Sequence, residues 1–371
     1  MSITAAIARK PDTNFEIGQV ELDAPRADEI LVRIHGAGLC HTDLAARDQH
    51  IPTPLPAILG HEGAGIVESV GAKVTKVKPG DHVVLSFRSC GICVTCKRNQ
   101  PAYCMEFFSL NLAGKRTDGT FTTHQHGEPV TSNFLSQSSF AEYSLAYERS
   151  VVKVPDDVPV HLLGPLGCAV QTGAGATMRS MACRAGSSIA ILGAGPVGLS
   201  AMLGAIVQGC STVVVSEPMA ERRALALELG ATHVIDPKAQ NLTEALLAIR
   251  PTGMDYVFDT TARSEVIQSG LNALARLGTL GLVGVPTSVA ATIAFNMGQL
   301  LGLGITIRGV CLGDSDPDVF IPQLIELYRQ GRMPFDKLIK TYPLRDINRA
   351  VQDQHDGKVV KAVLLTDAVV A

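Results

Sequence analysis

The stretch SSIAILGAGPVGLSAMLGAIVQGCSTVVVSEP, residues 187–218, decides the fold of the second half of this chain. An apolar strand leads into a glycine turn, an apolar helix follows, and a second strand rich in valine closes the stretch. Two strands joined in this way run parallel and need further units beside them to complete a sheet. The stretch therefore predicts a parallel sheet with helices on its faces.

The segments around this stretch differ in character. Downstream, ERRALALELGATHVID (221–236) and GMDYVFDTT (253–261) repeat the alternation of helix and strand. Upstream, residues 1–160 contain short β-branched runs such as EILVRIHGAGLC (29–40), bounded by Gly, Pro or Asp. The sequence therefore predicts an α/β fold, in which an irregular β-rich domain accompanies the parallel sheet.

The composition argues against a nucleic-acid-binding, secreted or membrane-spanning protein. The 371 residues include 32 Lys and Arg against 35 Asp and Glu, so the net charge is −3 and no basic surplus indicates a nucleic-acid partner. The N-terminus MSITAAIARK has no secretory pattern, and no unbroken apolar run reaches about 18 residues. We therefore expect a cytoplasmic protein without a membrane segment, where clustered cysteines more often bind metal than form disulfides.

The glycine turn predicts a dinucleotide site. Gly193, Gly195 and Gly198 follow the strand SIAIL in GxGxxG spacing, which suits a tight turn, close approach of a pyrophosphate and helix packing. Glu217 ends the next strand, 19 residues after Gly198, where a carboxylate can bind a ribose 2′-hydroxyl and repel a 2′-phosphate. NAD is therefore the predicted cofactor, although Arg222 nearby could accept the 2′-phosphate of NADP.

Four cysteines lie in SCGICVTCKRNQPAYC, residues 89–104. Their thiolates can converge on one cation, and a site closed by four sulfurs is typical of structural zinc. An iron–sulfur cluster is the competing metal, but the loop lacks the x3-C-P ending of a ferredoxin run. A disulfide pair is disfavoured by the expected compartment. The four residues are Cys90, Cys93, Cys96 and Cys104.

A second set of candidate ligands is scattered along the chain. Cys40 opens CHTD, His61 and Glu62 lie in GHE, and Cys168 lies in GPLGCAVQTG. Two thiolates and an imidazole would leave one position of a zinc ion open for water or substrate, which is the arrangement of a catalytic site. Spacing alone does not join these residues, and a single His or Cys most often belongs to the core.

These motifs resemble a known family. GHEGAGIVESVG (60–71) is similar to the signature of the zinc-containing medium-chain alcohol dehydrogenases, and the four-cysteine loop and GAGPVG follow in that family's order. The resemblance covers essentially the whole chain, to GKVVKAVLL (357–365). Within the family, the chain looks most like the NAD-dependent aryl-alcohol (benzyl alcohol) dehydrogenases, through CHTDL, LPAILGHEG, QPAYC, SSFAEY and LLGPLGCAVQTGAGA.

The resemblance implies an architecture. A GroES-like β-rich catalytic domain would occupy residues 1–169, carry both zinc sites and be completed by residues 310–371. A Rossmann NAD-binding domain with a doubly wound parallel sheet would occupy residues 170–309. Two zinc ions per subunit are implied, together with a homodimer in which residues 291–309 pair across the interface. A tetramer is the alternative assembly.

The resemblance also implies residue roles. Cys40, His61 and Cys168 would bind the catalytic zinc, with Glu62 as an occasional ligand or a residue behind the ligands. Asp43 would orient the imidazole, and Thr42 would accept the alcohol proton. The remaining implied contacts are His41 and Lys361 to the pyrophosphate, Thr172 and Val197 to the nicotinamide, and Phe87, Leu135 and Val285 in the substrate pocket.

Four further positions have no assigned role in this scheme. Many relatives carry a histidine five residues after the first ligand cysteine, but this chain has Ala45 there. We therefore expect the proton to leave through water or through His41, and His50 also lies nearby in sequence. The cysteines outside both clusters are expected in the core, and they are Cys183, Cys210 and Cys311.

The sequence leaves three functions open. The first is oxidation of a primary aryl alcohol to its aldehyde, with reversible hydride transfer to NAD. The second is the same chemistry on an allylic or terpenoid alcohol, or on S-(hydroxymethyl)glutathione. The third is a non-catalytic nucleotide-binding protein that kept the fold, which is disfavoured because all three zinc ligands are present.

Overall fold

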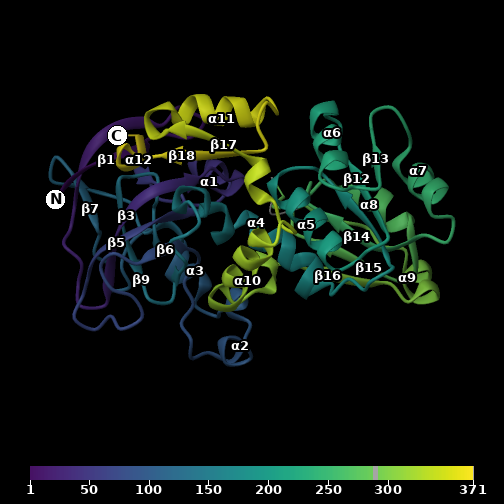
Figure 1. Cartoon of the computed structure of the whole chain (residues 1–371), viewed down its shortest axis with the longest axis horizontal. Coiled ribbons are helices and arrows are strands. Elements are labelled where there is room, and N and C mark those ends of the chain that lie inside the picture. The colour runs from purple at the N-terminus through teal and green to yellow at the C-terminus, as the bar shows by residue number, and fades with distance from the viewer. Residues whose placement is uncertain (287–290, 371) are drawn as a thin grey trace. The chain divides into compact units, whose positions relative to one another are not determined.

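The structure is a computed structural model that describes residues 1–286 and 291–370. The chain forms two compact units: in Figure 1 the first is mainly purple to blue with the yellow C-terminal segment, and the second is mainly teal to green. The first unit contains Met1–Cys168, Asp316–Leu324 and Asp336–Ala371, and the second contains Ala169–Ser315 and Ile325–Phe335.

The division of the tail differs from the expected boundary at residue 310. Residues 310–315 belong to the second unit, where the Ser315 hydroxyl donates to Gln171 Oε1 at 2.9 Å. Ile325–Phe335 also returns to the second unit, where Arg332 donates to the Val207 carbonyl at 3.2 Å. Hydrogen bonds between residues so far apart in sequence cannot be predicted from local sequence patterns.

The first unit is built mainly from antiparallel strands. One sheet has the order β4-β1-β2-β7-β8, and the other has the order β10-β6-β5-β3-β18-β17 with β9 paired to β3. The strands are β1 Ser2–Ala8, β2 Glu16–Leu22, β3 Glu29–Gly38, β4 Ala57–Ile58, β5 Gly63–Val70, β6 His82–Leu85, β7 Thr123–Gln125, β8 Glu128–Val130, β9 Tyr143–Tyr147, β10 Val151–Lys153, β17 Ile339–Pro343 and β18 Lys361–Leu365. The helices are α1 His41–Arg47, α2 Val94–Lys97, α3 Phe107–Asn111, α11 Ile347–His355 and α12 Asp367–Val370.

The core of the first unit comes from alternating side chains of these strands. In β1, Ile3, Ala5 and Ile7 point to the same side and are buried against Val20 of β2 and Leu145 of β9. The period of two places Ser2 and Thr4 on the opposite, more exposed face, where Ala6 and Ala8 farther along the strand are buried as well. The ten-residue strand β3 pairs with three others and runs directly to Cys40.

The second unit contains a parallel sheet with the order β13-β12-β11-β14-β15-β16. This is the strand order of a doubly wound dinucleotide-binding fold, so the predicted fold class is confirmed. The strands are β11 Ser188–Leu192, β12 Thr212–Ser216, β13 His233–Ile235, β14 Met254–Asp259, β15 Leu274–Leu282 and β16 Thr306–Gly309. The helices are α4 Ala169–Gly175, α5 Pro196–Val207, α6 Ala220–Glu228, α7 Leu242–Ile249, α8 Ser264–Asn272 and α9 Met297–Leu303, while α10 Pro317–Arg329 spans the division at Leu324.

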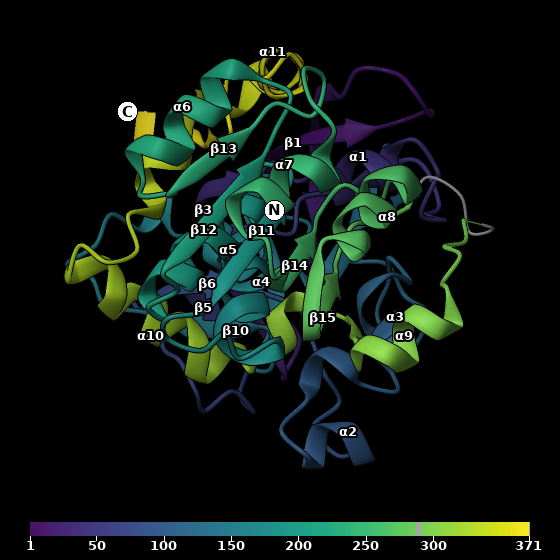
Figure 2. The same cartoon turned by 90° about the vertical axis from the view of Figure 1, so that its right-hand side faces the viewer.

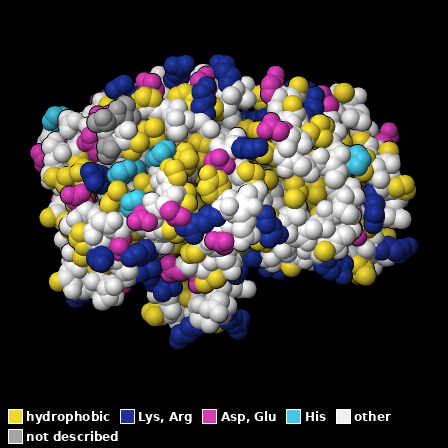
Figure 3. Space-filling view, viewed as in Figure 1, with side chains coloured by type: hydrophobic (Ala, Val, Ile, Leu, Met, Phe, Trp, Pro, Cys, Tyr) yellow, Lys and Arg dark blue, Asp and Glu magenta, His cyan; other side chains and the backbone are white. Residues whose placement is uncertain are grey.

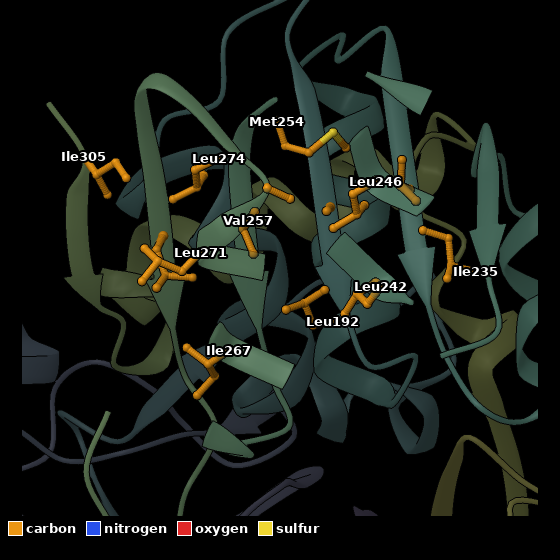
Figure 4. Packing of buried hydrophobic residues seen from close by; sticks show 14 residues of the cluster. Leu192, Ile235, Leu242, Leu246, Met254, Val257, Ile267, Leu271, Leu274 and Ile305 are labelled. Atoms are coloured by element: carbon orange, nitrogen blue, oxygen red, sulfur yellow. The ribbon is translucent and has the colours of Figure 1, made fainter. Parts of the chain in front are cut away.

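Helices cover both faces of this parallel sheet (Figure 2). The α8 backbone at Gly270 approaches the Leu192 side chain, whereas the start of α5 at Gly198 approaches Ile191. Neighbouring residues of a strand point to opposite faces, so α5 and α8 lie on opposite sides. On the α8 side, Leu192, Val257, Leu271 and further apolar side chains form one buried cluster (Figure 4).

The surface has no extended field of one charge on the face shown in Figure 3, where basic and acidic side chains are interspersed with apolar ones. Within residues 1–286 and 291–370, every helix is too short or too polar to span a bilayer.

Candidate functional site

Three strand ends bring the scattered residues together. In the antiparallel pair β3–β5, Ala37 lies opposite Gly63, so His61 and Glu62 just before β5 approach Cys40 just after β3. In the pair β3–β18, Gly38 lies opposite Val363, which brings Lys361 to the same end. The register of one strand against two neighbours therefore creates the site from segments far apart in sequence.

Cys168 reaches this site through a close backbone contact. It follows the turn Gly164–Gly167, and a Cβ atom on Gly164 would lie 2.1 Å from the Glu62 carbonyl oxygen. The Ser86 hydroxyl also donates to the Gly167 carbonyl at 2.7 Å. As a result, one ligand atom each from Cys40, His61, Glu62 and Cys168 lies within 4.8 Å of the others.

His61 presents one nitrogen to this cluster. Its Nδ1 lies 2.7 Å from Asp43 Oδ1, and the Asp43 carboxylate also accepts from the backbone N–H groups of Gly60 and Cys40, each at 3.0 Å. The carboxylate accepts from Nδ1–H, which leaves Nε2 as the lone-pair nitrogen. Nε2 is buried and has no hydrogen-bond partner among the described residues. An orphaned imidazole nitrogen beside two thiols fits a zinc ion.

The electrostatics of the cluster also suit a cation. The nearby Cys168 thiol, with help from His61, holds the pKa of Cys40 well below its usual value, while the proximity of Cys40 and burial raise the pKa of Cys168. Burial opposes the positive charge on His61, but Asp43 and the Cys40 thiolate outweigh it and raise the pKa of His61. Zinc requires deprotonated ligands, so its binding would release the protons held here.

Lys361 forms a buried ion pair beside the cluster. Its side chain is 2 % exposed, and its Nζ lies 2.8 Å from Glu62 Oε1 and 2.9 Å from the Leu39 carbonyl oxygen. Glu62 raises the pKa of the lysine against the effect of burial, while burial raises the pKa of Glu62 to about 7. The ammonium therefore neutralises a carboxylate beside the ligands, and its contact with a pyrophosphate stays a prediction.

The four-cysteine loop forms a second cluster in the first unit. All four sulfurs lie within 4.8 Å of one another. The Cys90 and Cys96 sulfurs are 3.9 Å apart, and those of Cys93 and Cys104 are 4.0 Å apart. A tetrahedron with Zn–S distances of about 2.3 Å has sulfurs separated by about 3.8 Å. The loop therefore fits one tetrahedral zinc ion without a free position.

The glycine turn of the second unit has the geometry expected of a phosphate site. Gly193 has φ +100°, and a Cβ on Gly198 would lie 1.9 Å from the Gly193 carbonyl oxygen. A Cβ on Gly195 would meet nothing within 4 Å, so this side of the turn is open. Gly195 is the N-cap of α5, and Pro196 and Val197 begin that helix. The open cradle at a helix N-terminus fits a pyrophosphate.

Glu217 lies at the rim of the same turn. Its carboxylate accepts from the backbone N–H of Ala194 at 2.8 Å and of Met219 at 3.0 Å. This places an acidic group against the glycine turn, as the sequence spacing predicts. Arg222 lies on α6 with a half-buried side chain, and it is Arg223 that donates to the Glu217 carbonyl at 2.7 Å.

The other residues expected to contact nucleotide or substrate divide between the units. Thr172 is buried in α4 of the second unit, and its hydroxyl has no partner among the described residues. Thr42 and the exposed His41 begin α1 in the first unit. Ala45 is 3 % exposed in that helix, so a histidine there would be overpacked in this chain.

The residues expected to line the substrate pocket are divided between the two units. Phe87 and Leu135 are buried in the first unit, whereas Val285 is largely exposed in the second. Sequence reasoning missed Phe134, whose ring packs edge-on against His61 with centroids 5.8 Å apart. It also missed Gln137, whose amide donates to the His61 carbonyl at 2.9 Å. No spacing in SNFLSQSS (132–139) indicates either contact.

Comparisons with known proteins agree with this geometry. Residues 26–156 match the family model of the alcohol dehydrogenase GroES-like domain, and residues 196–329 match that of the zinc-binding dehydrogenases. Geraniol dehydrogenase from Castellaniella defragrans is 46 % identical over 98 % of both chains. The crystal structure of benzyl alcohol dehydrogenase from Acinetobacter calcoaceticus has a TM-score of 0.95 with 43 % identity, covering 99 % of both chains.

A third relative has a less specific name. The crystal structure of an alcohol dehydrogenase zinc-binding domain protein from Burkholderia ambifaria has a TM-score of 0.96 with 48 % identity, covering 98 % of this chain and 99 % of that one. The chain belongs to the zinc-containing medium-chain alcohol dehydrogenases. It is an alcohol dehydrogenase that uses zinc and a nicotinamide cofactor.

Proposed function

We propose that the protein oxidises primary benzyl-type alcohols to aldehydes with NAD, and that it holds two zinc ions per chain. The observation that carries this proposal is the convergence of the Cys40 and Cys168 sulfurs with the orphaned His61 Nε2. A closed four-sulfur loop in the same unit would hold the second, structural zinc. The family supplies the reaction class, and the relative named benzyl alcohol dehydrogenase supports the choice of substrate.

The side chains of the cluster would divide the work. Cys40, His61 and Cys168 would hold the zinc ion, and Asp43 would keep the imidazole in the ligating tautomer. A zinc ion on these ligands would supply the Lewis acidity that lowers the pKa of the alcohol, and the nicotinamide would accept the hydride. Thr42, two residues after Cys40, would accept the hydroxyl proton and pass it to water or to the exposed His41.

The chemistry of the two relatives with named substrates favours an activated primary alcohol. Benzyl alcohol and geraniol each carry a π system on the carbon next to the hydroxyl-bearing carbon, which stabilises positive charge developing there as hydride leaves. Phe134 at His61 and the buried Phe87 supply aromatic and apolar surface in the same unit. An allylic terpenoid alcohol is the second candidate, because the relative named geraniol dehydrogenase is 46 % identical over nearly the whole chain.

A substrate panel separates these candidates. We expect kcat/KM for benzyl alcohol to exceed that for ethanol by at least ~10²-fold, because the missing ring forfeits several kcal/mol of apolar contact in the transition state. Cinnamyl alcohol, geraniol and S-(hydroxymethyl)glutathione complete the panel, measured as steady-state NADH formation. A higher kcat/KM for geraniol than for benzyl alcohol would favour the allylic function, and a preference for ethanol would contradict both.

Cofactor choice rests on the proposed contact of Glu217 with the adenosine ribose. Like charges about 4 Å apart near a protein surface repel by about 4 kcal/mol, so kcat/KM should favour NAD over NADP by roughly 10²-fold or more. Glu217→Gln should reduce this preference at least ~10-fold, because it removes the charge and keeps the side-chain length. Arg222→Ala is the matched control and should leave the preference of the parent unchanged. Equal use of both cofactors by the parent protein would contradict the proposal.

We further propose that the protein acts in the cytoplasm as a homodimer, with a tetramer as the alternative. Strand β16 stands last in the order of the parallel sheet and pairs with β15, and its side chains are mostly exposed. Nearby in sequence, Met297 and Leu301 of α9 are also strongly exposed. A strand at the sheet edge and exposed apolar side chains nearby in sequence support pairing with a second copy of the chain. A reducing compartment would keep the ligand cysteines available to zinc.

A further inference from the structure

Two cysteines of the second unit lie outside both zinc-type clusters. Cys183 follows the π-helical turn Ala176–Ser180, and its backbone N–H donates to the Thr177 carbonyl at 2.8 Å. Cys210 follows α5, and its backbone N–H donates to the Ala205 carbonyl at 3.1 Å. Both connections are therefore fixed by the backbone, and they precede β11 and β12, two neighbouring strands of the sheet.

The two side chains lie close together between these connections. The Cys210 sulfur lies 4.0 Å from the carbonyl oxygen of Arg184, the residue after Cys183, and the Gln208 amide donates to the Cys183 carbonyl at 3.3 Å. The Ser187 hydroxyl lies 3.4 Å from the Cys210 sulfur. The surroundings of the two thiols are unequal, because Cys183 is 3 % exposed while Cys210 is half-buried. Both are free thiols in this structure.

This inequality gives the two sulfurs different chemistry. The neighbouring Cys183 thiol, assisted by Ser187, lowers the pKa of Cys210 to about 7, whereas the proximity of Cys210 and burial raise the pKa of Cys183. Cys210 is thus a partly ionised, accessible thiol with a protonated thiol beside it. Thiols that react readily with peroxides share these properties, and a neighbouring cysteine resolves their oxidised form.

We propose that Cys210 and Cys183 form a peroxide-reactive pair that closes to a reversible disulfide. The Cys210 thiolate attacks one oxygen of a hydroperoxide, the O–O bond breaks, and Cys210 becomes a sulfenic acid while water or an alcohol leaves. The Cys183 sulfur then attacks the Cys210 sulfur, the S–O bond breaks and water leaves. Two thiols lose two electrons, the peroxide gains them, and an added dithiol reverses the change.

The position of the pair limits what the disulfide can affect. Cys183 and Cys210 precede the N-terminal ends of β11 and β12, whereas the glycine turn and Glu217 follow the C-terminal ends of the same strands. Each of these strands has five residues, and a strand rises about 3.3 Å per residue, so roughly 15 Å separates the pair from the nucleotide turn. The oxidised protein should therefore still bind nucleotide, and the closed loop should raise its resistance to thermal unfolding.

The experiment uses the full-length zinc-loaded protein treated with hydrogen peroxide. Peptide mapping should find a Cys183–Cys210 disulfide, lighter by two hydrogens and reversed by dithiothreitol, while the metal content stays constant. In Cys183→Ser, Cys210 should remain a sulfenic acid that dimedone traps. In Cys210→Ser, neither product should form at Cys183. The matched control is Cys311→Ser, which should leave the disulfide intact, since burial raises the pKa of Cys311 to about 11.

Alkylation rates in the parent protein test the proposal without the use of any variant. In the untreated parent at pH 7, iodoacetamide should alkylate Cys210 roughly 10²-fold faster than Cys311, because the thiolate reacts and the thiol does not. Equal alkylation rates, or a Cys210 that peroxide leaves reduced while other cysteines oxidise, would overturn the assignment. A disulfide between Cys210 and any cysteine other than Cys183 would overturn it as well.

Discussion

Replacing Cys168 by serine should abolish alcohol oxidation, lowering kcat/KM by roughly 10³-fold or more. Lewis-acid stabilisation of the transition state is worth several kcal/mol, and each 1.36 kcal/mol corresponds to about tenfold in rate. A serine hydroxyl stays protonated near neutral pH, so it cannot replace a thiolate among the ligands. Elemental analysis should find one zinc ion fewer per chain, while fluorescence titration should find nearly unchanged NADH binding.

The control for this experiment is Cys311→Ser, which changes a thiol of the second unit that lies outside both clusters. It should keep both zinc ions and the turnover of the parent. Turnover of Cys168→Ser within a factor of about three of the parent would remove Cys168 from the proposed ligand set. Loss of NADH binding together with turnover would indicate general misfolding of the variant. In that case trypsin should also cleave the variant faster than the parent at the four-cysteine loop.

The parts of the site that sequence predicts are those with local geometry. The glycine turn follows from residues 193–198 alone, because the turn, the helix start and the packing contact involve neighbours in sequence. The four-cysteine loop is similarly local, since its ligands fall within fifteen residues. In both cases the spacing determines which groups can converge, so the prediction needs no knowledge of the tertiary fold.

Long-range pairings set the rest of the site. Glu62 and Lys361 form a buried ion pair across 299 positions because β3 pairs with both β5 and β18. Register of this kind depends on the whole sheet, so the local sequence around Lys361 does not predict its pairing with Glu62. Cys183 and Cys210 were similarly expected only as core residues, and their contact depends on how the starts of β11 and β12 are connected.

The loop around the second cluster buries few apolar side chains of its own, and two of these are Pro101 and Ala102. Its helix α2 contains no buried residue, and Ile92 and Phe108 are 75 % and 74 % exposed. Apolar burial therefore contributes little to the free energy of folding of this loop. Structural zinc in small peptides contributes about 10–16 kcal/mol of apparent binding energy at pH 7. We infer that removing one ligand unfolds the loop while the strands of the first unit keep their own core.

Cys96→Ser should therefore lower Tm by about 10 °C, as expected for a loss of several kcal/mol in a chain of this size, and should remove one zinc ion per chain. Trypsin reports the loop directly, because Lys97 and Arg98 lie between the ligands and are exposed but held in a fixed backbone. Cleavage after these residues should become at least ~10-fold faster in Cys96→Ser, because the loop then opens without its metal. Cys168→Ser should show the parent's rate of cleavage there, so the two variants should separate loss of turnover from loss of local structure. Parent-like cleavage and Tm in a Cys96→Ser protein that has lost zinc would show that the loop folds without metal.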